Sequence, residues 1–307
     1  GSTHGHHTSS AMLSVEAFDM VNDPAKYPET ASQFGTWQPT RLFFNTSWWF
    51  YGSQKKFEKA DKSKLVSVET GNYFPSLGLS NGEIASLSRS MHQSQGFGST
   101  GSRGTETEYL ELLKGTMPSP NNLFDGINTN WSRLDGGNEI GAILKPLEEN
   151  FNFKNPSEML PKLLKAYPLI LNLKDSHWRK IKLVELKKLI LDCGGIFLEA
   201  VSEENSINPN QDFTVKIEAI NRGKSEVILK SIKNSEGKML WNQAENLAFN
   251  DSKKIEITVN SENKTPLYSS PYWLNETGSV GMYAAPESLI GLPETPALEQ
   301  LGFELQW

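Results

Sequence analysis

Strict alternation of apolar and polar side chains in the last third of the chain is the sequence feature that most constrains the fold. Every second residue from Phe213 to Ala219 is apolar, and the same period returns from Ile255 to Val259. Successive side chains of a β-strand point to opposite faces, so these segments predict strands with one buried face. Turn sequences rich in Asn, Gly and Ser separate the short strands. We therefore expect an antiparallel, immunoglobulin-like β-sandwich over residues 201–307, truncated at its end.

Residues 136–200 have apolar side chains at helical spacing instead, and this spacing predicts a helical segment. Asn155-Pro156 and Asp175-Ser176 are helix start signals, because a polar residue caps free amides and proline fits the first helical position. The expected helices cover residues 139–150, 156–173 and 176–192. The segment contains no catalytic motif, which indicates a structural role.

Basic residues are concentrated in this helical segment, although the chain as a whole is acidic. The formal net charge is −6, yet residues 154–188 contain nine basic and three acidic residues. The overall charge argues against a general nucleic-acid binder. The local excess is either a solvated lysine face on amphipathic helices or a surface that attracts anions. No apolar run is long enough for a bilayer, so we expect no membrane span.

The single cysteine, Cys193, excludes an internal disulfide and a cysteine-based zinc site. It lies at the apolar end of the third expected helix. A buried, inert thiol is therefore favoured over a catalytic nucleophile.

The first half of the chain mixes helix and strand signals. A capping box at Ser80 and Glu83 predicts a helix that runs toward Gln95. Another helix is expected from Ser9 or Ser10 to Val21, and strands over residues 41–45, 65–69 and 108–114. Four consecutive aromatic residues, 48–51, follow the first strand. They either pack in the core or form an aromatic wall suited to a sugar or an acyl group.

Three of the five histidines lie within residues 4–7, directly before the first expected helix. Imidazole is the commonest transition-metal ligand in proteins. In the His4-x-x-His7 pair, one ring can bind a metal while the other is directed at a reacting oxygen. A vector-derived leader and a solvated loop are the alternative interpretations of this stretch.

Two further motifs accompany the histidine pair. Residues 4–10 read HGHHTSS, residues 37–44 read WQPTRLFF, and residues 89–98 read RSMHQSQGFG, which includes His92. Together these motifs resemble the PIG-L (LmbE-like) family of zinc-dependent N-deacetylases, in its large multidomain bacterial form. The resemblance covers roughly residues 2–135.

The resemblance implies an α/β fold and a hydrolase function. Residues 1–135 would be the C-terminal part of a Rossmann-like deacetylase domain, which removes acetyl from an N-acetylated sugar or similar amide. His7 would be the zinc ligand, and His4 would stabilise the oxyanion. His92 would line the site as a further catalytic residue.

One departure from the family concerns the metal. PIG-L enzymes also take a His and an Asp ligand, and the general base, from a His-Pro-Asp-Asp motif that this sequence does not contain. A catalytic zinc site needs three protein ligands. We therefore expect an internal fragment that binds zinc weakly or not at all and has no activity by itself. Residues 10–110 should either self-associate through an exposed sheet edge or stay partly disordered.

The alternative function is a non-catalytic binding or scaffold module whose β-sandwich binds a carbohydrate or a protein. Large members of the family are often exported, so the resemblance favours a periplasmic or extracellular location, while a cytoplasmic one stays open.

Overall fold

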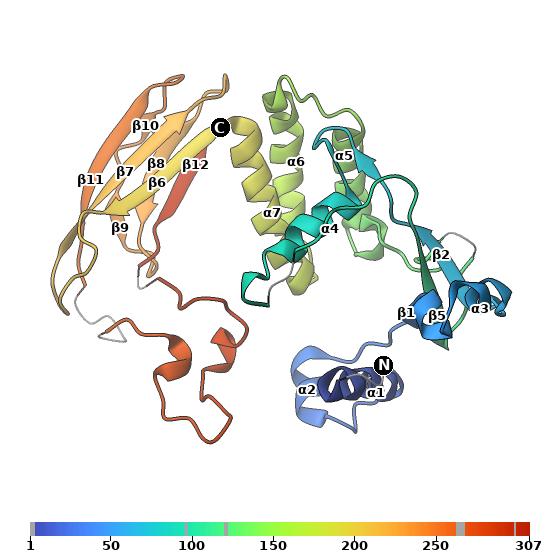
Figure 1. Cartoon of the computed structure of the whole chain (residues 1–307). Coiled ribbons are helices and arrows are strands. Elements are labelled where there is room, and N and C mark those ends of the chain that lie inside the picture. Colours follow the sequence, from blue (N-terminus) through green and yellow to red (C-terminus); the bar gives the residue numbers. More distant parts are fainter. Residues whose placement is uncertain (1–3, 96–97, 120–121, 262–267, 298) are drawn as a thin grey trace. The chain divides into compact units, whose positions relative to one another are not determined.

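The computed structural model describes residues 4–95, 98–119, 122–261, 268–297 and 299–307. The chain divides into two compact units, Gly1–Thr129 and Asn130–Trp307. The described residues form seven α-helices and several antiparallel sheets, so the protein is a mixed α/β protein (Figure 1). The expected domain boundaries at residues 135 and 200 stay predictions. No helix among the described residues has the length and apolar character needed to cross a bilayer.

The first unit contains a three-stranded sheet in the order β1-β5-β2. Its strands are β1 (Arg41–Thr46), β5 (Thr107–Gly115) and β2 (Leu65–Glu69), which confirms the three expected strands. Both pairs are antiparallel. The Rossmann-like domain implied by the resemblance is not confirmed, because sheets of that fold consist mostly of parallel strands. A short hairpin joins β3 (Tyr73–Phe74) to β4 (Leu79–Ser80).

The first helix, α1 (Gly5–Met20), begins earlier than the sequence predicts. Ser9 and Ser10 lie inside it, and His4 occupies the N-cap position without a capping side-chain hydrogen bond. None of its residues is buried, and Met12 is 68% exposed. The unit also contains α2 (Pro28–Phe34) and α3 (Gln54–Lys59).

The capping box predicted at Ser80 and Glu83 is confirmed at the start of α4 (Asn81–Ser90). The Glu83 amide donates to Ser80 Oγ at 3.2 Å, and the Ser80 amide donates to Glu83 Oε2 at 2.9 Å. The helix ends at Ser90, before the expected end near Gln95. Serines are frequent in its last turn and beyond, and their side chains compete for backbone hydrogen bonds.

The second unit begins with three helices, α5 (Gly137–Glu149), α6 (Leu160–Leu171) and α7 (Ser176–Gly194), in agreement with the helical prediction. The Asp175 carboxylate accepts the Trp178 amide at 3.0 Å and caps α7. The helices share one core cluster, whose most deeply buried members are Ile140, Ala166 and Ile170. Each fully buried aliphatic side chain of the size of isoleucine contributes roughly 1.5–3 kcal/mol.

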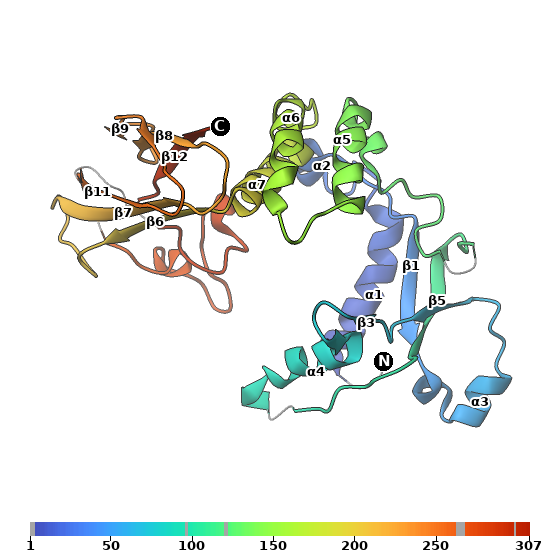
Figure 2. The same ribbon diagram turned by 90° about the horizontal axis from the view of Figure 1, so that it is seen from above.

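Two antiparallel sheets follow the helices, and Figure 2 shows the first of them from its edge. The first has the order β11-β7-β6, and the second has the order β10-β8-β12 with β9 also paired to β8. Their bounds are β6 (Ile196–Ser202), β7 (Phe213–Asn221), β8 (Ile228–Lys233), β9 (Met239–Trp241), β10 (Glu245–Asn246), β11 (Ser252–Val259) and β12 (Gly302–Gln306).

The alternation predicted for the strands is confirmed by their burial. Ile217 of β7 and Ile257 of β11 are buried, whereas their neighbours Lys216 and Glu256 are exposed. Residues of both sheets join one core cluster, which includes Leu229 and Ile217. The immunoglobulin-like topology itself stays a prediction.

Candidate functional site

The structure brings His4 and His7 together at the start of α1. His4 is the N-cap residue in extended conformation, and His7 lies in the first turn. Residues three apart on a helix share a face, and the two imidazole centroids lie 5.7 Å apart with planes inclined at 49°. Both side chains are exposed. The pair can therefore approach a common ligand from solvent.

His92 lies outside this pair, in the turn that follows α4. Its Nδ1 is 2.6 Å from Gln95 Oε1, and its amide donates to the Arg89 carbonyl at 3.1 Å. Because α4 ends at Ser90, His92 and Gln95 do not continue the helix as the sequence suggested. The hydrogen bond to Gln95 fixes the orientation of the imidazole instead.

His4, His7 and His92 do not form a three-histidine metal site. Across the residues that the structure describes, no group of three or more His, Cys, Asp or Glu side chains is arranged to hold a metal ion. A catalytic zinc takes three protein ligands, so the described residues do not provide a complete set.

The loop after His92 is tied to α4 by charged and polar groups. Arg103 forms an ion pair with Glu83 at 2.7 Å. The hydrogen bond from the Ser80 backbone lowers the pKa of Glu83, and the charge of Arg103 lowers it further. A Cβ on Gly82 would lie 2.0 Å from Ser102 Oγ, so only glycine allows this close approach. These contacts give the loop a structural role beside the capping box.

The aromatic run after β1 divides into an exposed and a packed part. Trp48 and Trp49 lie in a 3-10 turn, η1 (Trp48–Tyr51), and are 50% and 59% exposed. Tyr51 instead packs edge-on against buried Phe57, at 5.0 Å between ring centroids. The structure thus assigns Tyr51 to the packed part and the two indoles to the surface.

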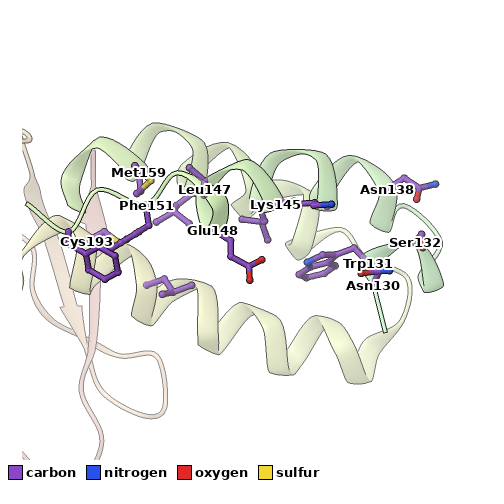
Figure 3. Close-up of a pocket in the computed structure, with 15 residues that line it drawn as sticks. Asn130, Trp131, Ser132, Asn138, Lys145, Leu147, Glu148, Phe151, Met159 and Cys193 are labelled. Atoms are coloured by element: carbon purple, nitrogen blue, oxygen red, sulfur yellow. The ribbon is translucent and has the colours of Figure 1, made fainter. Parts of the chain in front are cut away.

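The helical layer contains a groove that no sequence motif indicated. It has a volume of about 740 Å³ and lies between α5 and α7, with Leu163 of α6 also in its lining. Figure 3 shows Phe151 and Cys193 at one end, Trp131 at the other, and the Glu148 carboxylate between them. The spacing of apolar residues predicts which face of a helix is buried. The distance between two helices, and so the groove between them, depends on how their side chains pack.

Cys193 in this groove behaves as the sequence predicts for an inert thiol. It is buried, and burial raises the pKa of its thiol, with a smaller contribution from the charge of Asp192. A thiol with a raised pKa is a poor nucleophile. The groove therefore offers apolar contacts rather than covalent chemistry.

Comparisons with known proteins give no relative for this chain. No protein-family model, no curated protein and no solved structure matches it. Membership of the PIG-L family stays a prediction based on the three motifs.

Proposed function

We propose that residues 1–135 are part of a zinc-dependent hydrolase that removes an acetyl group from an N-acetylated sugar or a related amide. The observation that carries the proposal is the 5.7 Å separation of the His4 and His7 rings. Two exposed imidazoles at this distance can act on one bound group. The motifs around His92 and residues 37–44 support the same function through their resemblance to the family.

In this proposal each histidine has its own role. His7 binds the metal, and His4 donates a hydrogen bond to the substrate oxygen that gains negative charge. One such donor is worth about 10²–10³ in turnover. His92, whose Nδ1 lies 2.6 Å from Gln95 Oε1, is a site-lining residue only by the resemblance to the family. The described residues do not include a complete set of three zinc ligands, so His7 would hold the metal only together with ligands from outside this set.

The test is a complementation assay with N-acetylglucosamine as substrate and acetate release as the readout. We expect no release by the chain alone. We expect zinc-dependent release when a PIG-L segment with the His-Pro-Asp-Asp motif is fused before residue 1. His7→Ala should abolish this release, and His6→Ala is the matched control. A fusion that binds zinc and releases no acetate would contradict the hydrolase function.

The second candidate is a non-catalytic module that binds carbohydrate. The observation that favours it is the exposure of the neighbouring indoles of Trp48 and Trp49. Trp49 also packs edge-on against Phe50 at 5.0 Å, which restrains its ring. Rigid exposed aromatic rings stack well on the apolar face of a sugar. The resemblance favours a periplasmic or extracellular location for either candidate.

Titration with a soluble chitooligosaccharide distinguishes the two candidates. If the aromatic surface binds sugar, Trp49→Ala weakens binding by about three- to tenfold. Trp37→Ala is the control, because Trp37 is also exposed but lies outside the aromatic run. Equal binding by both variants would exclude the aromatic surface as the sugar site.

A further inference from the structure

A second cavity in the unit 130–307 lies between the helices and the second sheet. It has a volume of about 840 Å³, within the range of about 300–1,000 Å³ typical of small-molecule sites. Its walls come from α6, α7 and β12, and Figure 1 shows β12 beside α7. The apolar lining residues are Leu164, Ile190, Leu191, Leu198, Phe303 and Leu305. Such walls suit a flexible hydrocarbon chain.

The charged side chains that line this cavity leave one cation in excess. Lys187, Lys233 and Glu304 all line it. Lys233 and Glu304 form an ion pair at 3.2 Å and neutralise each other. Lys187 is exposed, and in the part of the chain that the structure describes it has no acidic partner. The cavity is therefore apolar inside and positive at one point of its rim.

Trp307 provides a second, independent sign of a ligand. Its ring lines the cavity and packs against both the helical cluster and the sheet cluster. Its indole nitrogen is buried, and no described residue accepts its hydrogen. Buried donors almost always have an acceptor, because an unsatisfied one costs roughly 1–3 kcal/mol. Trp307 therefore brings an unsatisfied donor to the wall of the cavity.

We propose that this cavity binds a medium-chain fatty acid. The hydrocarbon chain lies between Leu191 and Leu305, the carboxylate meets the Lys187 ammonium, and a carboxylate oxygen accepts the Trp307 indole hydrogen. A single negative charge matches the single excess cation. A neutral lipid leaves Lys187 unused, and a dianion brings a second negative charge for which the lining offers no second unpaired lysine.

The test is calorimetric titration of the whole chain with octanoate and with octanamide, its neutral counterpart of nearly equal shape. Saturable binding of one octanoate per chain is expected. Octanoate should bind about two- to fivefold more tightly than octanamide, since the ion pair is exposed. No saturable octanoate binding, or equal affinities for the two probes, would overturn the proposal.

Two variants test the proposed contacts of Lys187 and Trp307 with the ligand, and a third is the control. Lys187→Gln should remove the preference for octanoate, whereas Lys180→Gln, an exposed lysine of the same helix outside the cavity, should keep it. Trp307→Phe keeps a ring but loses the donor, and should weaken both probes by about two- to tenfold. An unchanged preference in Lys187→Gln would overturn the proposal. Neither the titration with the two probes nor the comparison of variants measures acetate release. The outcome therefore separates this site from the hydrolase function.

Discussion

The imidazole rings of His4 and His7 lie next to each other at the first turn of α1, with centroids 5.7 Å apart. The pair combines a helix N-cap residue with a first-turn residue, so the backbone of α1 places both side chains on one face of the helix. In the proposed function, the His7 imidazole is the metal ligand and the neighbouring His4 imidazole meets a group bound to that metal. This relationship leads directly to a prediction about zinc.

The isolated chain should bind zinc weakly, and His7 should account for most of that affinity. We expect His7→Ala to weaken zinc binding by about tenfold or more, since even outer-shell partners of a metal are worth that much. His4→Ala should retain the affinity. Competition with a chromophoric chelator measures both, and His6→Ala is the control. Equal losses in the His4 and His7 variants would contradict the proposed division of roles.

Asn221 should be a stability determinant of the second unit. The residue is 2% exposed. Its Nδ2 donates to the carbonyls of Ser225 at 2.8 Å and Leu247 at 3.1 Å, and its Oδ1 accepts the Gly223 amide at 3.0 Å. Asn221→Ala leaves these groups unsatisfied and should lower the free energy of unfolding by roughly 2–4 kcal/mol.

Urea unfolding followed by circular dichroism measures this loss. The matched control is Asn242→Ala, an exposed asparagine, for which a change within about 0.5 kcal/mol is expected. Similar changes in both variants would show that the hydrogen bonds of Asn221 do not stabilise the fold.

Glu304 should make stability depend on pH in the acidic range. Hydrogen bonds from the Ser231 hydroxyl and from Lys233, in that order, lower the pKa of its carboxyl. A lowered folded-state pKa gives stability that is present above the unfolded pKa of about 4.3 and is lost as pH falls through the folded value. Glu304→Gln should therefore lower the melting temperature near neutral pH and show a smaller difference from the parent in acid.

Thermal melts of the parent and the variant across about pH 2.5–7 measure this effect. The window extends roughly two units on either side of the unfolded-state pKa of the Glu304 carboxyl. Glu226→Gln, an exposed glutamate before β8, is the control. A difference between the Glu304 variant and the parent that grows as pH falls would contradict the predicted direction of the effect.

The first unit should self-associate through the edges of its sheet. In the described residues β1 and β2 each pair only with β5, so both are edge strands. Unpaired strand edges recruit further strands, and lysine on an edge opposes this pairing. Asn45→Lys places a charge at an exposed position of β1 and should lower the dimer fraction. Asn72→Lys, exposed and outside this sheet, is the control.

Sedimentation velocity over a range of chain concentrations measures the dimer fraction. A parent chain that stays monomeric at every concentration would show that the edges of β1 and β2 are not association sites.

The local features of this protein were predictable from its sequence. The two-residue period from Phe213 to Ala219 marks a strand with one buried face, and β7 follows it. The Ser80 and Glu83 capping box and the Asp175 cap mark where helices begin. These predictions hold because a strand face, a cap and a helix period depend on residues only a few positions apart.

Only the tertiary structure determined which segments meet. Strand β5 pairs with β1 and β2, which precede it by many residues, and the pairs are antiparallel where the resemblance implied a parallel sheet. The groove between α5 and α7 and the placement of Trp307 against both core clusters are likewise long-range results. Strand partners and helix separations depend on the packing of side chains distant in sequence, and no local pattern encodes that packing.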